Sequence, residues 1–190
     1  MLSQPETYLT PDEYLTIERK AAYKSEYSDG EMFAMAGASS RHNLIASNII
    51  RELSLQLKNR SCEVYSGDMR VRVSDAGLYT YPDIAVMCGD PQFDDEELDT
   101  LLNPIVIVEV MSDSTQKYDR GEKFALYKAL ESLKEYLLVA QNSSLVEHYV
   151  RQPDNRWVFS ETKKMEDSVD LPSILCSLAL TEIYDKILMM

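Results

Sequence analysis

The apolar positions of the chain follow two periods, one helical and one extended. Between residues 40 and 57 they recur every three or four positions, which predicts a long helix with one face against a core. That apolar stripe consists of Ile45, Ala46, Ile49, Ile50, Leu53 and Leu57. Ser39 or Ser40 is the expected N-cap of this helix.

From residue 62 onward the period becomes two, which indicates strands. Three successive strands are predicted at 62–66, 69–73 and 78–87, and the last of them runs through Pro82 and Asp83. The stretch 104–111 is almost wholly apolar and β-branched, as expected of a strand covered on both faces.

The N-terminal region predicts a capped helix followed by a hairpin. Thr10 and Glu13 form the pattern of a capping box around Pro11, and the helix is expected to extend to about residue 22. The Asp29-Gly30 pair predicts a tight turn between two short strands.

The C-terminal half predicts a helix, a strand, an antiparallel pair and a short final helix. Their expected positions are about 115–130, 135–140, 144–150 with 156–162, and from 181 onward. The order of elements indicates one domain over residues 1–190, with a mixed central β-sheet flanked by helices. This is an α/β class with α+β character.

Composition narrows the function classes. The chain is 45% hydrophobic and 27% charged, which is typical of a folded protein. Its 19 basic and 32 acidic residues give a net charge of −13. That excess excludes a simple basic groove for DNA, but it leaves open an enzyme that meets phosphate through a bound cation.

Cysteine usage and the absence of targeting patterns suggest a reduced, cytoplasmic protein. The three cysteines are Cys62, Cys88 and Cys176, an odd number without a C-x-x-C pair, so we expect neither a disulfide nor a thiolate zinc site. The chain does not start with the basic and apolar pattern of a signal peptide, and it has no apolar run of the roughly 20 residues that a membrane span needs.

Two carboxylates stand out by their position in apolar segments. Glu109 lies inside the stretch 104–111, where a charge is costly unless it is paired or bound to a metal. Asp83 opens the preceding apolar segment, and two acids on neighbouring strands repel unless a cation lies between them. Their oxygen ligands suit Mg²⁺ or Mn²⁺ rather than zinc. Alternatively, Glu109 meets solvent or an arginine at the strand end, and Asp83 is a turn residue.

The helix after Glu109 carries a polar face. Asp119, Lys123 and Tyr127 are spaced by four residues and therefore share that face. It is either an ordinary solvated face with a salt bridge, or a face on which Lys123 leans towards the two carboxylates to orient a water or offset developing charge.

At these residues the chain resembles a known family. TYPDIAVM and IVEVMSDSTQKYDRGEKFALYKALESLKEYLLV are similar to segments of the Uma family of bacterial restriction-endonuclease-like proteins, and DGEMFAMAGASSRH is similar to its N-terminal block. The resemblance implies the PD-(D/E)XK nuclease fold. It also implies an endodeoxyribonuclease that uses Mg²⁺ or Mn²⁺ to hydrolyse DNA phosphodiester bonds and binds DNA weakly, with assistance from the metal.

The resemblance also implies roles for individual residues. Asp83 and Glu109 match the two acids of the motif, as metal ligands. Glu31 matches a third family acid that would complete the metal site; alternatively, it is a polar strand residue beside the Asp29-Gly30 turn. The usual lysine position, two residues after Glu109, holds Met111. The resemblance implies that Lys123 replaces that lysine in catalysis.

Three further residues are weaker candidates. Lys117 is the nearest competitor of Lys123, but it does not share the helical face of Asp119 and Tyr127. Asp68 follows a glycine and could be another acid near the cleft. His42 heads the apolar stripe of the long helix, where a histidine is more often structural than a base.

The basic residues are concentrated in a few places, which suggests a local basic rim on an acidic protein. The rim would consist of Arg70, Arg72, Lys117, Arg120, Lys123 and Lys128. The acidic stretch 90–99 is read as a solvated loop that carries unfavourable charge away from the cleft.

Two alternatives to a nuclease are weighed. Met111 in the lysine position favours a catalytically weak or inactive binding module with the same fold. A carboxylate-pair glycosidase would need sugar-stacking aromatic residues, and the single tryptophan, Trp157, is far from Glu109 in the sequence. The apolar C-terminal segment 183–190 suggests packing against a partner and hence a homodimer.

Overall fold

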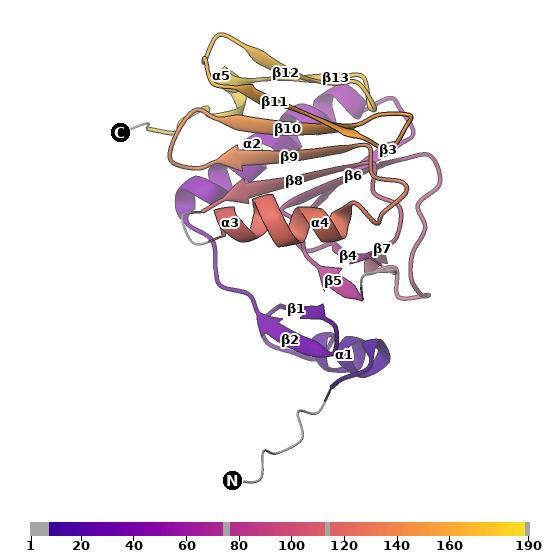
Figure 1. Cartoon of the computed structure of the whole chain (residues 1–190). Helices are drawn as coiled ribbons and strands as arrows, with labels where there is room; N and C mark the ends of the chain where they lie inside the picture. Colours follow the sequence, from indigo (N-terminus) through magenta and orange to yellow (C-terminus); the bar gives the residue numbers. More distant parts are fainter. Residues whose placement is uncertain (1–7, 74–76, 113–114, 189–190) are drawn as a thin grey trace.

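The largest sheet has six strands in the order β11-β10-β9-β8-β6-β3. The computed structural model describes residues 8–73, 77–112 and 115–188. The strands are β3 (Cys62–Ser66), β6 (Ile84–Cys88), β8 (Val106–Met111), β9 (Glu135–Ala140), β10 (Val146–Arg151) and β11 (Trp157–Thr162). β8 and β9 run parallel, and the other neighbours are antiparallel. The expected class, a mixed sheet flanked by helices, is confirmed (Figure 1).

A second sheet of five strands has the order β2-β1-β5-β4-β7. Its members are β1 (Ser25–Ser28), β2 (Glu31–Ala34), β4 (Arg70–Val73), β5 (Leu78–Thr80) and β7 (Thr100–Leu101). The expectation of one strand over 78–87 is wrong, because β5 belongs to this sheet and β6 to the larger one. Pro82 cannot donate to a ladder, so the chain leaves one sheet before it and enters the other after it.

Alternation along β8 divides the core into two layers. Val106, Val108 and Val110 belong to the cluster on one face of the large sheet, and Ile107 and Met111 to the cluster on the other face. All six residues of β8 are buried, as its composition predicted. Glu109 therefore faces the same layer as Ile107 and Met111.

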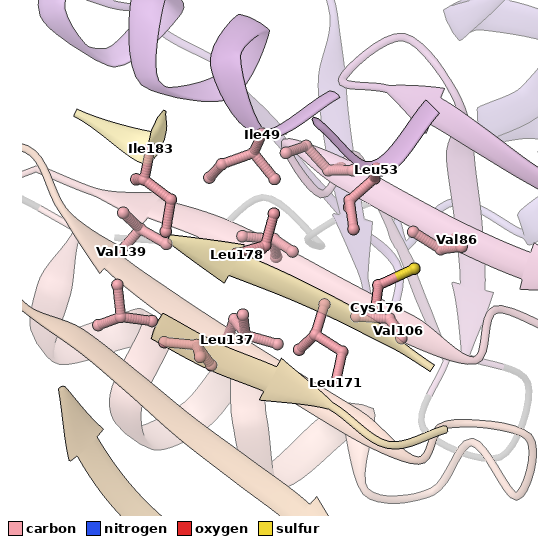
Figure 2. Packing of buried hydrophobic residues seen from close by; sticks show 14 of the residues in the cluster. Ile49, Leu53, Val86, Val106, Leu137, Val139, Leu171, Cys176, Leu178 and Ile183 are labelled. Carbon is pink, nitrogen blue, oxygen red and sulfur yellow. The ribbon is translucent and has the colours of Figure 1, made fainter. Parts of the chain in front are cut away.

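The first layer is closed by α2 (Ser40–Leu57), α5 (Leu180–Ile183) and the hairpin of β12 (Ser168–Leu171) and β13 (Cys176–Ala179). Figure 2 shows Ile49, Leu53, Leu178 and Ile183 packed over the sheet. The predicted stripe of α2 is confirmed, with Ser39 as its N-cap. The β12–β13 hairpin was not predicted.

The N-terminal helix α1 (Pro11–Glu18) and the β1–β2 hairpin lie at one end of the molecule (Figure 1). The predicted capping box of Thr10 and Glu13 is present, but the helix ends at Glu18 rather than near residue 22. The turn is confirmed at Asp29 and Gly30, where both φ angles are positive, at 49° and 95°.

The helix after β8 is not a continuous α-helix. It consists of α3 (Gln116–Tyr118), the π-helical turn η2 (Asp119–Lys123) and α4 (Phe124–Tyr127), and so ends earlier than the predicted residue 130. Such single π turns often occur at functional sites. Asp119, Lys123 and Tyr127 still share the buried side of this helix.

The apolar C-terminal segment packs within its own chain. Leu180, Ile183 and Tyr184 are buried in the layer beneath α2. Ile183 and Tyr184 of the segment that suggested a partner are therefore covered, whereas Leu188 is 82% exposed, so the homodimer stays a prediction. No helix among the described residues is long and apolar enough to cross a membrane.

The acidic stretch 90–99 is not simply a solvated loop. Asp99 accepts from Arg19 and Arg70, each at 2.8 Å, Asp95 pairs with Arg19 at 2.7 Å, and Asp94 pairs with Arg72. The Arg19 guanidinium is the main reason why the pKa of Asp99 lies well below its ordinary value. The loop thus fastens α1 and β4 together.

The predicted basic rim is also wrong for most of its members. Arg70, Arg72, Arg120 and Lys123 are each neutralised by a carboxylate within the fold. The sequence showed where these cations are concentrated but not that acids distant in the chain would reach them.

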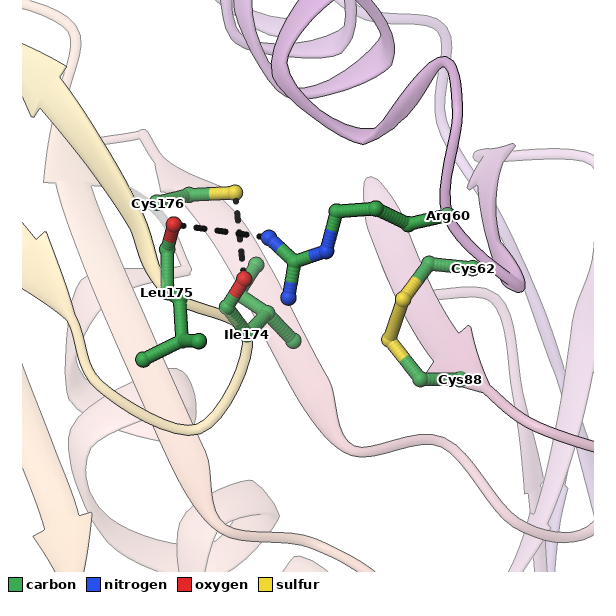
Figure 3. Close-up of a disulfide and its surroundings, with 6 residues drawn as sticks. All are labelled: Arg60, Cys62, Cys88, Ile174, Leu175 and Cys176. Atoms are coloured by element: carbon green, nitrogen blue, oxygen red, sulfur yellow. Dashed lines mark hydrogen bonds between the residues drawn. A yellow bond between two sulfur atoms is a disulfide. The ribbon is translucent and has the colours of Figure 1, made fainter.

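Contrary to expectation, two of the cysteines form a disulfide. Cys62 and Cys88 face each other in the antiparallel register of β3 and β6, with their Cα atoms 4.0 Å apart (Figure 3). The odd cysteine count misled the prediction, because the pairing follows from strand register rather than from spacing. Cys176 is the free cysteine; burial raises the pKa of its thiol, which donates to the Ile174 carbonyl at 3.4 Å.

Reducing this disulfide is expected to lower the free energy of unfolding by about 3–4 kcal/mol, because it closes a loop between residues 26 apart in sequence. Urea unfolding of the oxidised and the reduced protein measures the difference. The double variant Cys62→Ser/Cys88→Ser should have the same unfolding midpoint in urea as the reduced protein. Adding a reductant should not change that midpoint. Equal unfolding midpoints for the oxidised and reduced protein would contradict the prediction.

Candidate metal centre and catalytic cluster

Asp83 and Glu109 lie side by side where β6 and β8 meet. The pairing of Ile84 with Val108 places Asp83 opposite Glu109 in the next antiparallel position. The backbone N–H of Val110 donates to Asp83 Oδ2 at 2.7 Å, which fixes the carboxylate against β8. The sequence-predicted acids are therefore neighbours in the fold.

Glu109 is almost fully buried, with 5% of its surface exposed. Its Oε1 accepts from the Tyr127 hydroxyl at 2.9 Å and from Lys123 Nζ at 2.9 Å. Burial is the main cause that raises the pKa of Glu109 to about 8; the charge of Lys123 opposes this rise, and the charges of Asp83 and Asp119 add to it. A group with this pKa holds a proton readily until a cation replaces it.

Lys123 lies between two carboxylates. Its Nζ is 2.9 Å from Glu109 Oε1 and 3.2 Å from Glu26 Oε1, and Thr80 donates its hydroxyl to the same Glu26 oxygen. Burial opposes the charge of Lys123, but Glu109 and Glu26 outweigh it and hold the pKa of this lysine well above its ordinary value. The side chain thus stays an ammonium inside the protein.

Met111 fills the position where the motif has its lysine. The side chain is buried and packs in the layer that contains Ile107 and Tyr127. Lys123 enters from the helix that covers this layer, whereas Lys117, six residues earlier, is exposed. Of these two lysines, Lys123 is the one that the fold brings to Glu109.

His42 contacts the other acid. At the start of α2, its Nε2 lies 2.8 Å from Asp83 Oδ1. Both oxygens of Asp83 are therefore engaged, one by His42 and one by the Val110 N–H. The sequence could not give this pairing, because only the packing of α2 against the large sheet brings residues 42 and 83 together.

Asp119 adds a further acid from the π-helical turn. It is 4% exposed, and burial raises its pKa, with the charges of Asp83 and Glu26 raising it further. The sequence predicts that Asp119 shares a helical face with Lys123, but it does not predict that Asp119 lies near Asp83 and Glu26. The i,i+4 spacing from Asp119 to Lys123 was the available signal.

Two other predicted acids are placed differently. Glu31 is exposed at the end of β2, opposite Ser28, so its assignment as a metal ligand stays a prediction. Asp68 is exposed and pairs with Lys24 at 2.9 Å. The acid that reaches the cluster from the hairpin is Glu26, which sequence reasoning missed; the polar position between buried Ser25 and Tyr27 was its only signal.

The cluster has more negative than positive charge. Glu26, Glu109 and Asp119 act on one lysine, and Asp83, which contacts His42, lies beside Glu109. No three acidic, histidine or cysteine side chains among the described residues are arranged as a ready cation cage. The donor set nonetheless fits Mg²⁺, which takes one or two carboxylates and completes its shell with waters and substrate phosphate.

The fold is that of a nuclease-like α+β domain. A putative nuclease of DUF820 from Anabaena variabilis superposes with a TM-score of 0.75 at 18% identity, over 95% of this chain and 99% of that one. The profile of the Uma2 family, described as "Putative restriction endonuclease", matches residues 11–181. The chain belongs to the Uma2 family.

Two uncharacterised proteins of Synechocystis sp. are similar over most of their length. One, sll1609, is 39% identical over 80% of this chain and 86% of its own. The other, slr1290, is 35% identical over 96% of this chain and 94% of its own. The second of these similarities covers nearly the whole chain.

Proposed function

We propose that this protein is a metal-dependent endonuclease that hydrolyses DNA phosphodiester bonds. The observation that carries the proposal is the juxtaposition of Asp83, Glu109 and Lys123 at the junction of β6, β8 and the following helix. Membership of a restriction-endonuclease-like family supports the same conclusion. Mg²⁺ or Mn²⁺ is the proposed cofactor.

In this mechanism Asp83 and Glu109 hold the cation. When bound there, Mg²⁺ would supply a water of lowered pKa and a polarised phosphate. Lys123 orients the water or offsets the charge that develops on the phosphate oxygens. Tyr127 holds Glu109 Oε1, and His42 holds Asp83 Oδ1, so that both carboxylates keep their positions.

A catalytically weak binding module with the same fold is the second candidate. Met111 in the lysine position favours it, since Lys123 must reach the phosphate from another backbone element. The ion pairs of Lys123 with Glu26 and Glu109 also favour the binding module. The ammonium must leave one of these carboxylates before it can contact a substrate phosphate.

A cleavage assay on plasmid, linear duplex and single-stranded DNA, with Mg²⁺ or Mn²⁺ and with chelator, tests the proposal. We expect metal-dependent nicking that Asp83→Ala abolishes together with metal binding in calorimetry. Wild-type protein that binds the cation but cuts none of these DNA forms would favour the binding module.

We further propose a cytoplasmic location, where cellular DNA would be the substrate. A reducing cytoplasm would open the Cys62–Cys88 disulfide, so the assay is run with both the oxidised and the reduced protein. A homodimer stays a prediction, and a light-scattering mass equal to one chain of 21.7 kDa would contradict it.

A further inference from the structure

The arginines of this acidic protein are mostly neutralised within the fold. Those paired with a carboxylate are Arg19, Arg51, Arg70, Arg72, Arg120 and Arg156. Within the described residues Arg41, Arg60 and Arg151 have no such ion pair. These three are therefore the arginines whose charge the described acids leave uncompensated.

Arg41 is held by neutral acceptors only, as far as the described residues extend. Its Nη1 donates to Asn142 Oδ1 at 3.1 Å and its Nη2 to the Leu188 carbonyl at 3.2 Å. The side chain is half-buried, so these bonds orient the guanidinium without removing it from solvent. A guanidinium keeps further N–H donors available for an anionic ligand when two of them are used in this way.

Arg41 also lies beside the catalytic cluster. The next residue of α2, His42, contacts Asp83 Oδ1 at 2.8 Å. On the other side, the N–H of Gln141 donates to the carbonyl of Met111 at 3.3 Å, two residues after Glu109. Arg41 thus belongs to α2, which borders the proposed site, and its guanidinium bonds to Asn142, next to Gln141, and to the C-terminal segment at Leu188.

Two acid-free segments contribute to the surface around Arg41. The sequence has no Asp or Glu between Glu31 and Glu52, and none between Glu135 and Glu147. The two segments meet where the Ser39 hydroxyl donates to Gln141 Oε1 at 2.9 Å. In a chain with a net charge of −13, an approaching polyanion meets less repulsion at a surface where acids are few.

We propose that Arg41 binds a phosphate of the DNA backbone. This phosphate would neighbour the one whose ester bond is cut. This inference rests on the proposed nuclease function and adds where the substrate lies: over the start of α2 and the β9–β10 turn. Arginine recognises phosphate through paired N–H donors, and such contacts position DNA without reading its sequence.

The test measures DNA binding by fluorescence anisotropy over a range of salt concentrations, with Ca²⁺ as the cation. Arg41→Gln and Arg41→Glu are compared with Arg60→Gln and Arg60→Glu. Arg60 is the matched control, because it follows the far end of the same 18-residue helix and donates to a neutral acceptor, the Leu175 carbonyl, at 3.4 Å (Figure 3). Thermal melting and Mg²⁺ calorimetry verify that fold and cation binding are retained.

We expect Arg41→Glu to weaken DNA binding at low salt by about tenfold or more, equally for different sequences, and to reduce the salt slope by about one. The Arg60 variants should stay within about twofold of wild type. If the wild type cuts DNA and the Arg41 variants bind it normally, this inference is wrong and the nuclease function stands.

Two other outcomes also overturn the inference. Equal losses in the Arg41 and Arg60 variants would indicate a diffuse effect of net charge rather than a contact at Arg41. A wild-type protein that neither binds nor cuts any DNA form would refute the inference and the proposed function together.

Discussion

Replacing Lys123 by methionine should reduce DNA cleavage by at least about 10²–10³-fold and destabilise the protein by about 3–5 kcal/mol. Methionine preserves the length of the side chain but removes the ammonium that Glu109 and Glu26 share at 2.9 and 3.2 Å. The buried Glu109 and the partly buried Glu26 then both lose the ammonium that lies between them. Cleavage rates and urea unfolding measure the two losses.

Lys117→Met is the control for this prediction, because Lys117 is exposed on the same helix. It should leave both cleavage and stability close to wild type. The double variant Lys123→Met/Glu109→Gln should recover part of the lost stability but no activity. Normal cleavage by Lys123→Met, or loss of cleavage in Lys117→Met alone, would refute the assignment of Lys123.

The metal-free protein should lose stability as the pH rises from about 4.5 to about 8. Burial raises the pKa of Glu109 from 4.5 to about 8, so in this range the folded chain holds a proton that the unfolded chain has released. Deprotonation of Glu109 in the unfolded state therefore favours unfolding. The free energy of unfolding falls by up to roughly 5 kcal/mol by the time the pH reaches about 8.

Urea unfolding at several pH values in chelator measures this slope. Glu109→Gln should flatten it, whereas the exposed Glu161→Gln should leave it unchanged. Because the cation and the proton compete for the same carboxylate, Mg²⁺ affinity should also rise over this pH range. An equal slope in wild type and Glu109→Gln would contradict the raised pKa.

Much of the fold could be predicted because local patterns determine it. The apolar stripe of α2, the capping box of α1 and the covered strand β8 each depend on short-range periodicity. The division of 78–87 between two sheets could not be predicted, since it depends on which strands accept β5 and β6 as neighbours. The disulfide depends on register in the same way.

The candidate site was predictable only in part, for a similar reason. An acid in an apolar strand is visible in the sequence, so Asp83, Glu109 and the face of Lys123 could be selected. Glu26 and His42 reach the cluster through packing between distant segments, and neither has a distinctive neighbourhood in the sequence.

The attachment of the β1–β2 hairpin has a consequence for how the protein would lose its activity. Among the described residues the ladder between β1 and β5 consists of the pairs Tyr27–Tyr79 and Ser28–Leu78, whereas the whole length of β8 is paired with β9. Partial opening starts where cooperative support is weakest, and amide hydrogens there exchange first. Glu26 would then separate from Lys123 while the six-stranded sheet stays protected, so inactivation would precede global denaturation.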